Sequence, residues 1–303
     1  MRGSRCGRRR GMTRADLVVL VLVGLTLLGI ALSALLRSHE DSGRVQCAFH
    51  LKQLGDGIQR FSARTNGLPP ARIAPGYATW AVLIAPDVYH TKDSPLKAWD
   101  VQQSYYAQPA AARQMQLPIA YCPARRYPPQ NSTAGDVPGG KEGGELYPGA
   151  LGDYAAVAGD GNAKHPWDSE GANGPLILGE VLQREGERIL KWRSRTSLKL
   201  LAKKESYTAL LGEKHVPRGQ FGQVAAGDGS IYNGDYPESF SRVGGEGFPL
   251  ARSPEGPYRR NFGSYHVDGV CQFLMADGAV KPFTPTLDER VLGQMTTRPS
   301  PEK

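Results

Sequence analysis

Residues 17–36 read LVVLVLVGLTLLGIALSALL, a run of twenty residues without a charged side chain. As an α-helix this run would be about 30 Å long, which matches the hydrocarbon core of a bilayer. A cleaved signal peptide is the alternative, but its apolar part is normally only about 7–15 residues long. We therefore expect a retained transmembrane helix.

The charges beside this run predict its orientation. Six arginines precede it, and Arg37 alone lies in the turn after it. Because the more positive flank of a membrane helix stays in the cytoplasm, we expect a cytoplasmic N-terminus. The expected location is the inner membrane, with a single span, the lipid bilayer as a partner, and a C-terminal domain that is periplasmic or on the cell surface.

The overall charge excludes one class of partner. Residues 1–37 contain seven arginines and one aspartate, so they hold +6 of the formal net charge of +8. Nucleic-acid-binding proteins concentrate positive charge on the domain that touches phosphate. The other 266 residues of this chain are nearly neutral, so we expect no nucleic-acid partner.

An amphipathic helix is predicted to follow the apolar run. Leu51, Leu54, Ile58 and Phe61 recur at intervals of three or four residues, which places them on one helical face. The sequence Gly-Leu-Pro-Pro at 67–70 should end this helix. One helix from about residue 14 to 65 is the expected result.

Beyond residue 70 the pattern changes to short apolar runs separated by glycine, proline, asparagine and aspartate. Strands are predicted at 79–84, 207–211 and 270–275, a short exposed helix within 183–206, and a hairpin turn at Asp277-Gly278. The expected fold is α+β: a long N-terminal transmembrane and amphipathic helix, then a β-rich antiparallel globular domain. Its expected parts are a basic leader (1–11), the helix (12–65) and an exported domain (66–303) with loop insertions near 124–149 and 234–256.

The motifs for catalysis and cofactor binding are weak. GDVPGGK at 135–141 fits the start of a phosphate-binding loop, but Glu142 replaces the required serine or threonine. Loops around Asp160 and Asp228 are rich in oxygen ligands but lack the spacing of a calcium-binding loop, and Asx turns are the commoner explanation for such loops. We expect no enzyme, no catalytic residue and no cofactor.

The cysteines leave two interpretations open. Cys47, Cys122 and Cys271 lie in the expected exported part, where three thiols permit one disulfide. Zinc binding is the competing explanation, but the chain has no C-x-x-C and its six histidines are scattered singly. We therefore expect no metal site.

Residues 11–16, Gly-Met-Thr-Arg-Ala-Asp, resemble the cleavage and methylation signal of type IV prepilins. The resemblance implies that a prepilin peptidase cuts after Gly11 and methylates Met12. It also implies that the Asp16 carboxylate pairs with the N-terminal amine of a neighbouring subunit. Arg14 departs from the family pattern, which has leucine there.

Two further stretches resemble a planctomycete-type prepilin-like, or pseudopilin, family of unknown function. RVQCAFHLKQLG at 44–55 is similar to the family's stretch around its first exported cysteine. The family's C-terminal hallmark, a histidine, nine residues and Asp-Gly, is matched by His266 and Asp277-Gly278 with ten intervening residues. The resemblance implies a disulfide between Cys47 and Cys122.

This resemblance favours a membrane-anchored, pseudopilin-like structural protein, a subunit or accessory of a pilus-like or secretion-related assembly. Its partners would be copies of itself or other pilin-like subunits, contacted through the N-terminal helix. The alternative is an anchored periplasmic or surface module that binds a glycan, a solute or calcium. Cleavage after Gly11 distinguishes the two, because only assembly requires it.

Overall fold

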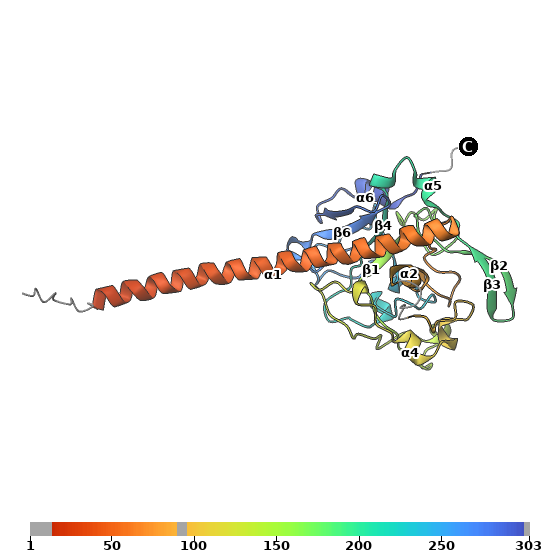
Figure 1. The fold of residues 1–303 in the computed structure, drawn as a ribbon, viewed down its shortest axis with the longest axis horizontal. Coiled ribbons are helices and arrows are strands. Elements are labelled where there is room, and N and C mark those ends of the chain that lie inside the picture. Colours follow the sequence, from red (N-terminus) through yellow and green to blue (C-terminus); the bar gives the residue numbers. More distant parts are fainter. Residues whose placement is uncertain (1–13, 90–95, 300–303) are drawn as a thin grey trace, which may run out of the picture. The chain divides into compact units, whose positions relative to one another are not determined.

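The computed structural model describes residues 14–89 and 96–299 (Figure 1). The chain divides into two compact units, 1–42 and 43–303. The helices are α1 (Arg14–Thr65), α2 (Trp80–Val88), α4 (Ala110–Arg113), α5 (Leu198–Leu201) and α6 (Glu289–Thr296), with 3-10 helices η1 (Tyr105–Ala107), η2 (Pro118–Ala120), η3 (Pro138–Gly140), η4 (Glu205–Tyr207), η5 (Val224–Ala226), η6 (Pro237–Ser239) and η7 (Val267–Gly269). The strands are β1 (Tyr154–Gly159), β2 (Glu180–Glu185), β3 (Arg188–Arg193), β4 (Ala209–Glu213), β5 (Ser241–Val243), β6 (Cys271–Met275) and β7 (Val280–Phe283).

The first unit contains the N-terminal part of α1. The large apolar side chains at positions 17–32 are all exposed, with exposed fractions between 49% at Val23 and 66% at Ile30. These residues follow one another along the helix, so the apolar surface surrounds the helix and is not confined to one face.

The structure does not bear out the expected transmembrane helix. Among the residues that the structure describes, no helix combines the length and the apolarity needed to cross a bilayer.

In the second unit, the C-terminal part of α1 forms one wall of the core. Leu51, Leu54, Ile58 and Phe61 are all buried, as their spacing predicted. A Cβ atom on Gly55 would come within 2.6 Å of Leu274 Cδ1, so this glycine lets the helix approach β6 closely. The helix ends before Asn66, whose positive φ of 58° reverses the chain.

A five-stranded sheet lies at the centre of the domain, in the order β5-β1-β4-β6-β7. All neighbours are antiparallel except β1 and β5, which are parallel. Alternate residues of β1 enter two different apolar clusters: Tyr154 and Ala156 pack with residues of α1, whereas Ala155 and Val157 pack with residues of α6. The sheet therefore has a helix on each face, which is an α+β arrangement.

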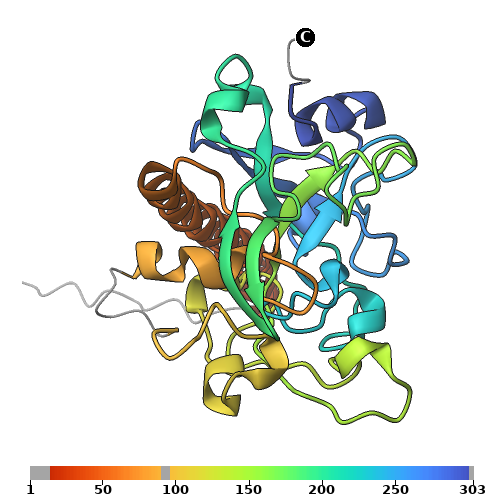
Figure 2. The same cartoon turned by 90° about the vertical axis from the view of Figure 1, so that its right-hand side faces the viewer.

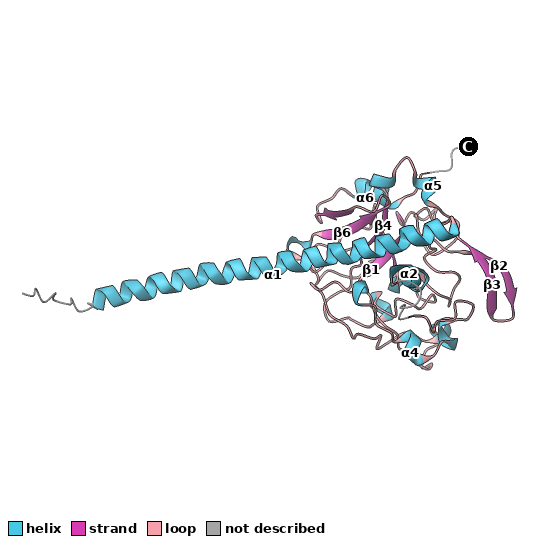
Figure 3. Ribbon diagram, in the orientation of Figure 1, coloured by secondary structure: helices cyan, strands magenta, loops and turns pink. Residues whose placement is uncertain are grey.

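One local prediction was wrong, since residues 80–84 begin helix α2 and are not a strand. In the stretch 183–206, where a short helix was expected, residues 183–193 belong to the β2–β3 hairpin and the short helix is α5 at Leu198–Leu201. The hairpin projects from the right-hand edge of the domain in Figure 1 and points toward the viewer in Figure 2. Loops make up much of the domain (Figure 3), in keeping with 37 glycines and 23 prolines. The short strand β5 lies in the stretch 234–256, where the sequence predicted a loop insertion.

The predicted turn at Asp277-Gly278 is confirmed. It joins β6 to β7, and Gly278 has a positive φ of 83°. Asp277 Oδ1 accepts a hydrogen bond from the Ala279 amide at 2.9 Å. Lys52 Nζ on α1 donates to the carbonyl oxygen of Gly278 at 3.0 Å, so this turn is docked on the helix.

Candidate functional site

Four distant segments bring a cysteine pair, a glutamate and a histidine together. Cys47 comes from α1, Cys122 follows η2, Glu213 ends β4, and His266 precedes η7. The ligand atoms of these four residues lie within 4.8 Å of one another, and all four residues are buried. We call them the Cys–Glu–His centre.

Glu213 contacts both His266 and Cys122 in this centre. Its Oε1 atom lies 3.0 Å from His266 Nε2, and its Oε2 atom accepts a hydrogen bond from the backbone N–H of Gln272 at 2.7 Å. Both the Glu213 and the His266 side chains are only 1% exposed. A buried carboxylate needs donors, so we assign a proton to His266 Nε2, which donates to Glu213.

Cys122 and His266 make further contacts in the centre, and the side-chain nitrogen of Gln272 lies 3.4 Å from His266 Nε2. Cys122 Sγ lies 3.3 Å from Glu213 Oε1 and 3.7 Å from His266 Nε2. Because this sulfur is in a disulfide, it carries no proton and donates to neither atom. The other ring nitrogen of His266, Nδ1, is buried and has no hydrogen-bond partner within the described residues.

Cys47 and Cys122 form a disulfide, with 5.2 Å between their Cα atoms. It links α1 to a loop 75 residues further along the chain. Of the other cysteines, Cys271 is free and buried beside the centre, where its thiol donates to the Glu213 carbonyl oxygen at 3.5 Å. Burial raises the pKa of this thiol, and the nearby Glu213 carboxylate raises it further.

A second group of buried charges adjoins the centre. We call it the buried ion network: Arg125, Arg126, Asp153, Lys214 and Asp228. Asp153 Oδ1 lies 3.0 Å from Arg125 Nη1 and 2.7 Å from Arg126 Nη2. Asp228 pairs with Arg126 at 2.5 Å and with Lys214 at 3.0 Å. The Cys122 amide donates to Asp153 Oδ2 at 2.9 Å, which connects the network to the disulfide.

Opposing effects set the protonation of this network. Burial alone would raise the pKa of Asp228, but the adjacent Arg126 and Lys214 charges lower it well below its ordinary value. Burial lowers the pKa of Lys214 to about 8, although Asp228 acts against this shift. The close contacts of Lys214 Nζ with Asp228 and with the Ser239 carbonyl oxygen, at 3.0 and 2.9 Å, favour the charged pair near neutral pH.

The histidine and the Asp-Gly of the family hallmark do not form one site. His266 lies before β6 and Asp277-Gly278 after it, so the whole strand separates them. His266 belongs to the buried centre, whereas Asp277-Gly278 forms the turn docked on α1. Of the predicted processing residues, Gly11 and Met12 lie outside the described residues. Asp16 lies within α1, but its side chain is outside what the structure describes.

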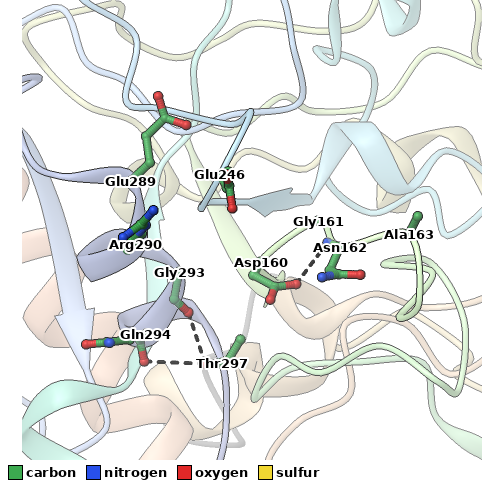
Figure 4. Close-up of a pocket in the computed structure, with 10 residues that line it drawn as sticks. All are labelled: Asp160, Gly161, Asn162, Ala163, Glu246, Glu289, Arg290, Gly293, Gln294 and Thr297. Atoms are coloured by element: carbon green, nitrogen blue, oxygen red, sulfur yellow. Dashed lines mark hydrogen bonds between the residues drawn. The ribbon is translucent and has the colours of Figure 1, made fainter.

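The two oxygen-rich loops have different environments. Asp228 belongs to the buried ion network, where its carboxylate forms ion pairs with the side chains of Arg126 and Lys214. Asp160 lines an open pocket of about 490 Å³ together with Glu246, Glu289 and Arg290 (Figure 4). Asp160 Oδ1 accepts hydrogen bonds from the Asn162 amide at 2.9 Å and from Asn173 Nδ2 at 3.0 Å, so it holds its own loop in place.

Most of the buried charges could not be assigned a role from the sequence. Glu213 and Lys214 end the stretch LLGEK at 210–214, which matches no catalytic or metal-binding motif. The available signal was the pair of opposite charges at the end of a fully apolar strand. Because β4 is buried along its whole length, a charged side chain at its end is buried too, and buried charges need partners.

A comparison with protein families matches residues 40–290 to the family described as a protein of unknown function (DUF1559). The chain belongs to the DUF1559 family. This is a family of planctomycete-type pilin-like proteins, so the broad resemblance seen in the sequence is correct. No curated protein and no solved structure matches this DUF1559 chain. The matched range contains the Cys–Glu–His centre and the buried ion network, and it begins after the prepilin-like motif at 11–16.

Proposed function

We propose that this DUF1559 protein is a pilin-like structural subunit that assembles through the N-terminal part of α1. The observation that carries the proposal is the exposed apolar surface of residues 17–32. A helix that is apolar on all sides is stable in water only when something covers it, and contiguous exposed apolar surface of this kind marks an interaction site.

The partner that we propose is the same helical segment of further copies, or of other pilin-like subunits. Because the apolar side chains surround the helix, one flat partner surface would leave part of it uncovered. A bundle in which each helix has several neighbours covers all sides. Leucine, valine and isoleucine predominate in the segment, and these side chains interdigitate well between helices.

Removal of the leader is part of the proposal. Residues 1–11 contain five arginines, and parallel helices in a bundle would place these charges side by side, where they repel. Cleavage after Gly11 by a prepilin peptidase removes that repulsion. It also creates an amine at Met12 for the carboxylate of Asp16 on a neighbouring subunit.

Export of the globular unit is also part of the proposal. The disulfide between Cys47 and Cys122 supports it, because disulfides persist mainly in oxidising compartments outside the cytoplasm.

Mass spectrometry of the N-terminal peptide from native cells tests processing. We expect a chain that begins at a methylated Met12. An intact start at Met1 or Arg2 in all of the protein would overturn the subunit proposal, because the leader would then remain in every copy.

Cysteine cross-linking in the same cells tests assembly. In a Cys6→Ser background, Leu25→Cys should give disulfide-linked dimers on mild oxidation. Glu187→Cys, at an exposed position of the β2–β3 hairpin, is the matched control and should give few. Equal cross-linking of the two variants, or none with Leu25→Cys, would contradict assembly through α1.

A further inference from the structure

We propose that the Cys–Glu–His centre is a structural zinc site when its disulfide is reduced. The ligands would be Cys47 Sγ, Cys122 Sγ, Glu213 Oε1 and His266 Nε2. The ligand spacing in the sequence gave no hint of such a site, because the four residues come from four separate segments. The fold places their ligand atoms within 4.8 Å of one another.

The spacing of these atoms suits a tetrahedral ion. Around zinc, with bonds of about 2.0–2.3 Å, neighbouring ligand atoms lie about 3.3–3.8 Å apart. Glu213 Oε1 lies 3.3 Å from Cys122 Sγ and 3.0 Å from His266 Nε2, and Cys122 Sγ lies 3.7 Å from His266 Nε2. Three edges of a tetrahedron are therefore close to the required length, and breaking the disulfide frees the two sulfurs to separate.

The chemistry of the ligands favours zinc among the common divalent ions. Two thiolates and an imidazole are ligands that zinc prefers, whereas magnesium and calcium take oxygen ligands. The set is complete with four protein atoms, as in closed structural zinc sites. Two thiolates and the Glu213 carboxylate carry three negative charges, and the zinc ion neutralises two of them.

The surroundings of Glu213 orient this ligand. The backbone N–H of Gln272 donates a hydrogen bond to Glu213 Oε2 at 2.7 Å, which leaves Oε1 directed at Cys122 Sγ and the His266 ring. A hydrogen bond of this kind to a ligating carboxylate is typical of metal sites. His266 is 4% exposed and its Nδ1 has no partner within the described part of the chain, so the ring is held only through Nε2. Moving the proton from Nε2 to Nδ1 makes Nε2 a ligand.

The change between the two forms is a balanced two-electron reduction. A phosphine reductant supplies two electrons and leaves as the phosphine oxide, with its oxygen taken from one water molecule. The S–S bond breaks, and the two sulfurs take up the two protons of that water to become thiols. Zinc binding then displaces both thiol protons to solvent.

The oxidised, disulfide-bonded protein and the reduced, zinc-bound protein would both have α1 linked to the loop after η2. The disulfide joins α1 to the loop after η2. The zinc ion would join these two elements and also β4 and the segment before η7, through Glu213 and His266. Because all four ligands are buried, zinc would enter while the reduced chain folds, which is how closed sites are loaded.

The test uses the full-length chain with Cys6→Ser, which removes a thiol outside the described residues. The protein is unfolded, reduced with a phosphine, and refolded without oxygen in zinc chloride or cobalt chloride. After gel filtration we expect about one zinc per reduced chain and the visible absorption of tetrahedral, thiolate-bound cobalt. The oxidised protein, unfolded and refolded in the same metal solutions but without the phosphine, is the matched control and should retain no metal.

Variants identify the ligands. Replacing Cys47 and Cys122 together by serine should abolish metal retention, and Glu213→Gln or His266→Gln should weaken zinc affinity at least tenfold. Cys271→Ser, which removes the third buried thiol, should keep one zinc per chain. The proposal is overturned if reduced protein retains no zinc, if the oxidised protein binds it equally, or if Cys271→Ser abolishes binding. The cobalt spectrum of the reduced Cys6→Ser protein decides the question even where a variant fails to fold.

Discussion

His266 Nε2 lies 3.0 Å from Glu213 Oε1, and neither side chain is more than 1% exposed, although 53 residues separate the two positions in the chain. The histidine of the family hallmark therefore lies in the interior of the domain. There it supplies a hydrogen-bond donor to a carboxylate that has no access to water. The contact joins β4 to the segment before β6, next to the disulfide that holds α1.

We expect the disulfide to make a large contribution to stability. Replacing Cys47 and Cys122 together by alanine should lower the free energy of unfolding by ~4 kcal/mol, because the bond closes a loop of 75 residues in the unfolded chain. Urea unfolding of the oxidised proteins in EDTA measures this difference. Reduced wild-type protein, as the control, should unfold at nearly the urea concentration of the variant. A variant as stable as the oxidised wild type would contradict the expectation.

Asp228→Asn should destabilise the domain strongly. The substitution leaves the buried cations of Arg126 and Lys214 without their shared carboxylate, and breaking a buried ion pair from one side costs about 3–5 kcal/mol. The measurement is chemical unfolding. Glu255→Gln, at the exposed Arg218–Glu255 pair, is the matched control and should change stability little. Similar effects of the two substitutions would show that the buried ion network is not important for stability.

His215 should make stability depend on pH in a defined window. Burial lowers the pKa of this histidine to about 4 from an ordinary value of 6.5. Between these values the unfolded chain binds more protons than the folded one, so stability is fully present above about pH 6.5 and falls as the pH is lowered toward 4. Thermal unfolding of wild type and His215→Gln across this range measures the effect.

The control for this prediction is His165→Gln, because His165 is exposed. This variant should keep the wild-type slope of stability with pH, whereas His215→Gln should flatten it between pH 6.5 and 4. Asp228 has a lowered pKa too, but its contribution is lost only at still lower pH, as the pH falls below the ordinary range of a carboxyl group. A slope that His215→Gln leaves unchanged would mean that other groups titrate in this window.

Gly234→Ala should be among the more damaging small substitutions in the loops. A Cβ atom at this position would overlap the carbonyl oxygen of Tyr77, a backbone atom that cannot turn aside. The Gly234 carbonyl is also fixed, since it accepts a hydrogen bond from the buried Arg72 at 2.7 Å. We expect a loss of about 3 kcal/mol in unfolding free energy.

Gly171→Ala provides the comparison, because its nearest neighbour would be Ser169 Oγ at an ordinary 3.5 Å. This substitution should leave the stability almost unchanged. If both alanine variants unfold at the same denaturant concentration, the chain near Gly234 must be able to shift, contrary to the expectation.

Local signals in the sequence predicted the parts of the fold that local chemistry decides. The spacing of Leu51, Leu54 and Ile58 identified the buried face of α1, and Asp277-Gly278 identified the turn between β6 and β7. Each of these depends on a helical period or on one turn conformation. They are therefore visible in a short window of sequence.

Predictions from the sequence failed where tertiary packing decides which secondary structure forms or which distant residues meet. The apolar run at 80–84 is short enough to form either a strand or a helix, and packing in the core selects helix α2. A short helix was predicted within 183–206, but Gly186, with a φ of 54°, makes the turn of a hairpin in the first part of this stretch, and the short helix α5 occupies only 198–201. The Cys–Glu–His centre depends on contacts between positions 53 to 144 residues apart, and no local pattern encodes them.

The position of the disulfide has a mechanical consequence. The globular unit begins at residue 43, and Cys47 lies four residues further along the same helix. A pulling force that enters the unit along α1 therefore reaches a covalent bond within about one helical turn and passes directly to the loop at Cys122. The noncovalent contacts of Leu51, Leu54 and Ile58 are then relieved of most of the load. The oxidised domain should resist extraction of its helix under tension far better than its thermal stability alone would suggest.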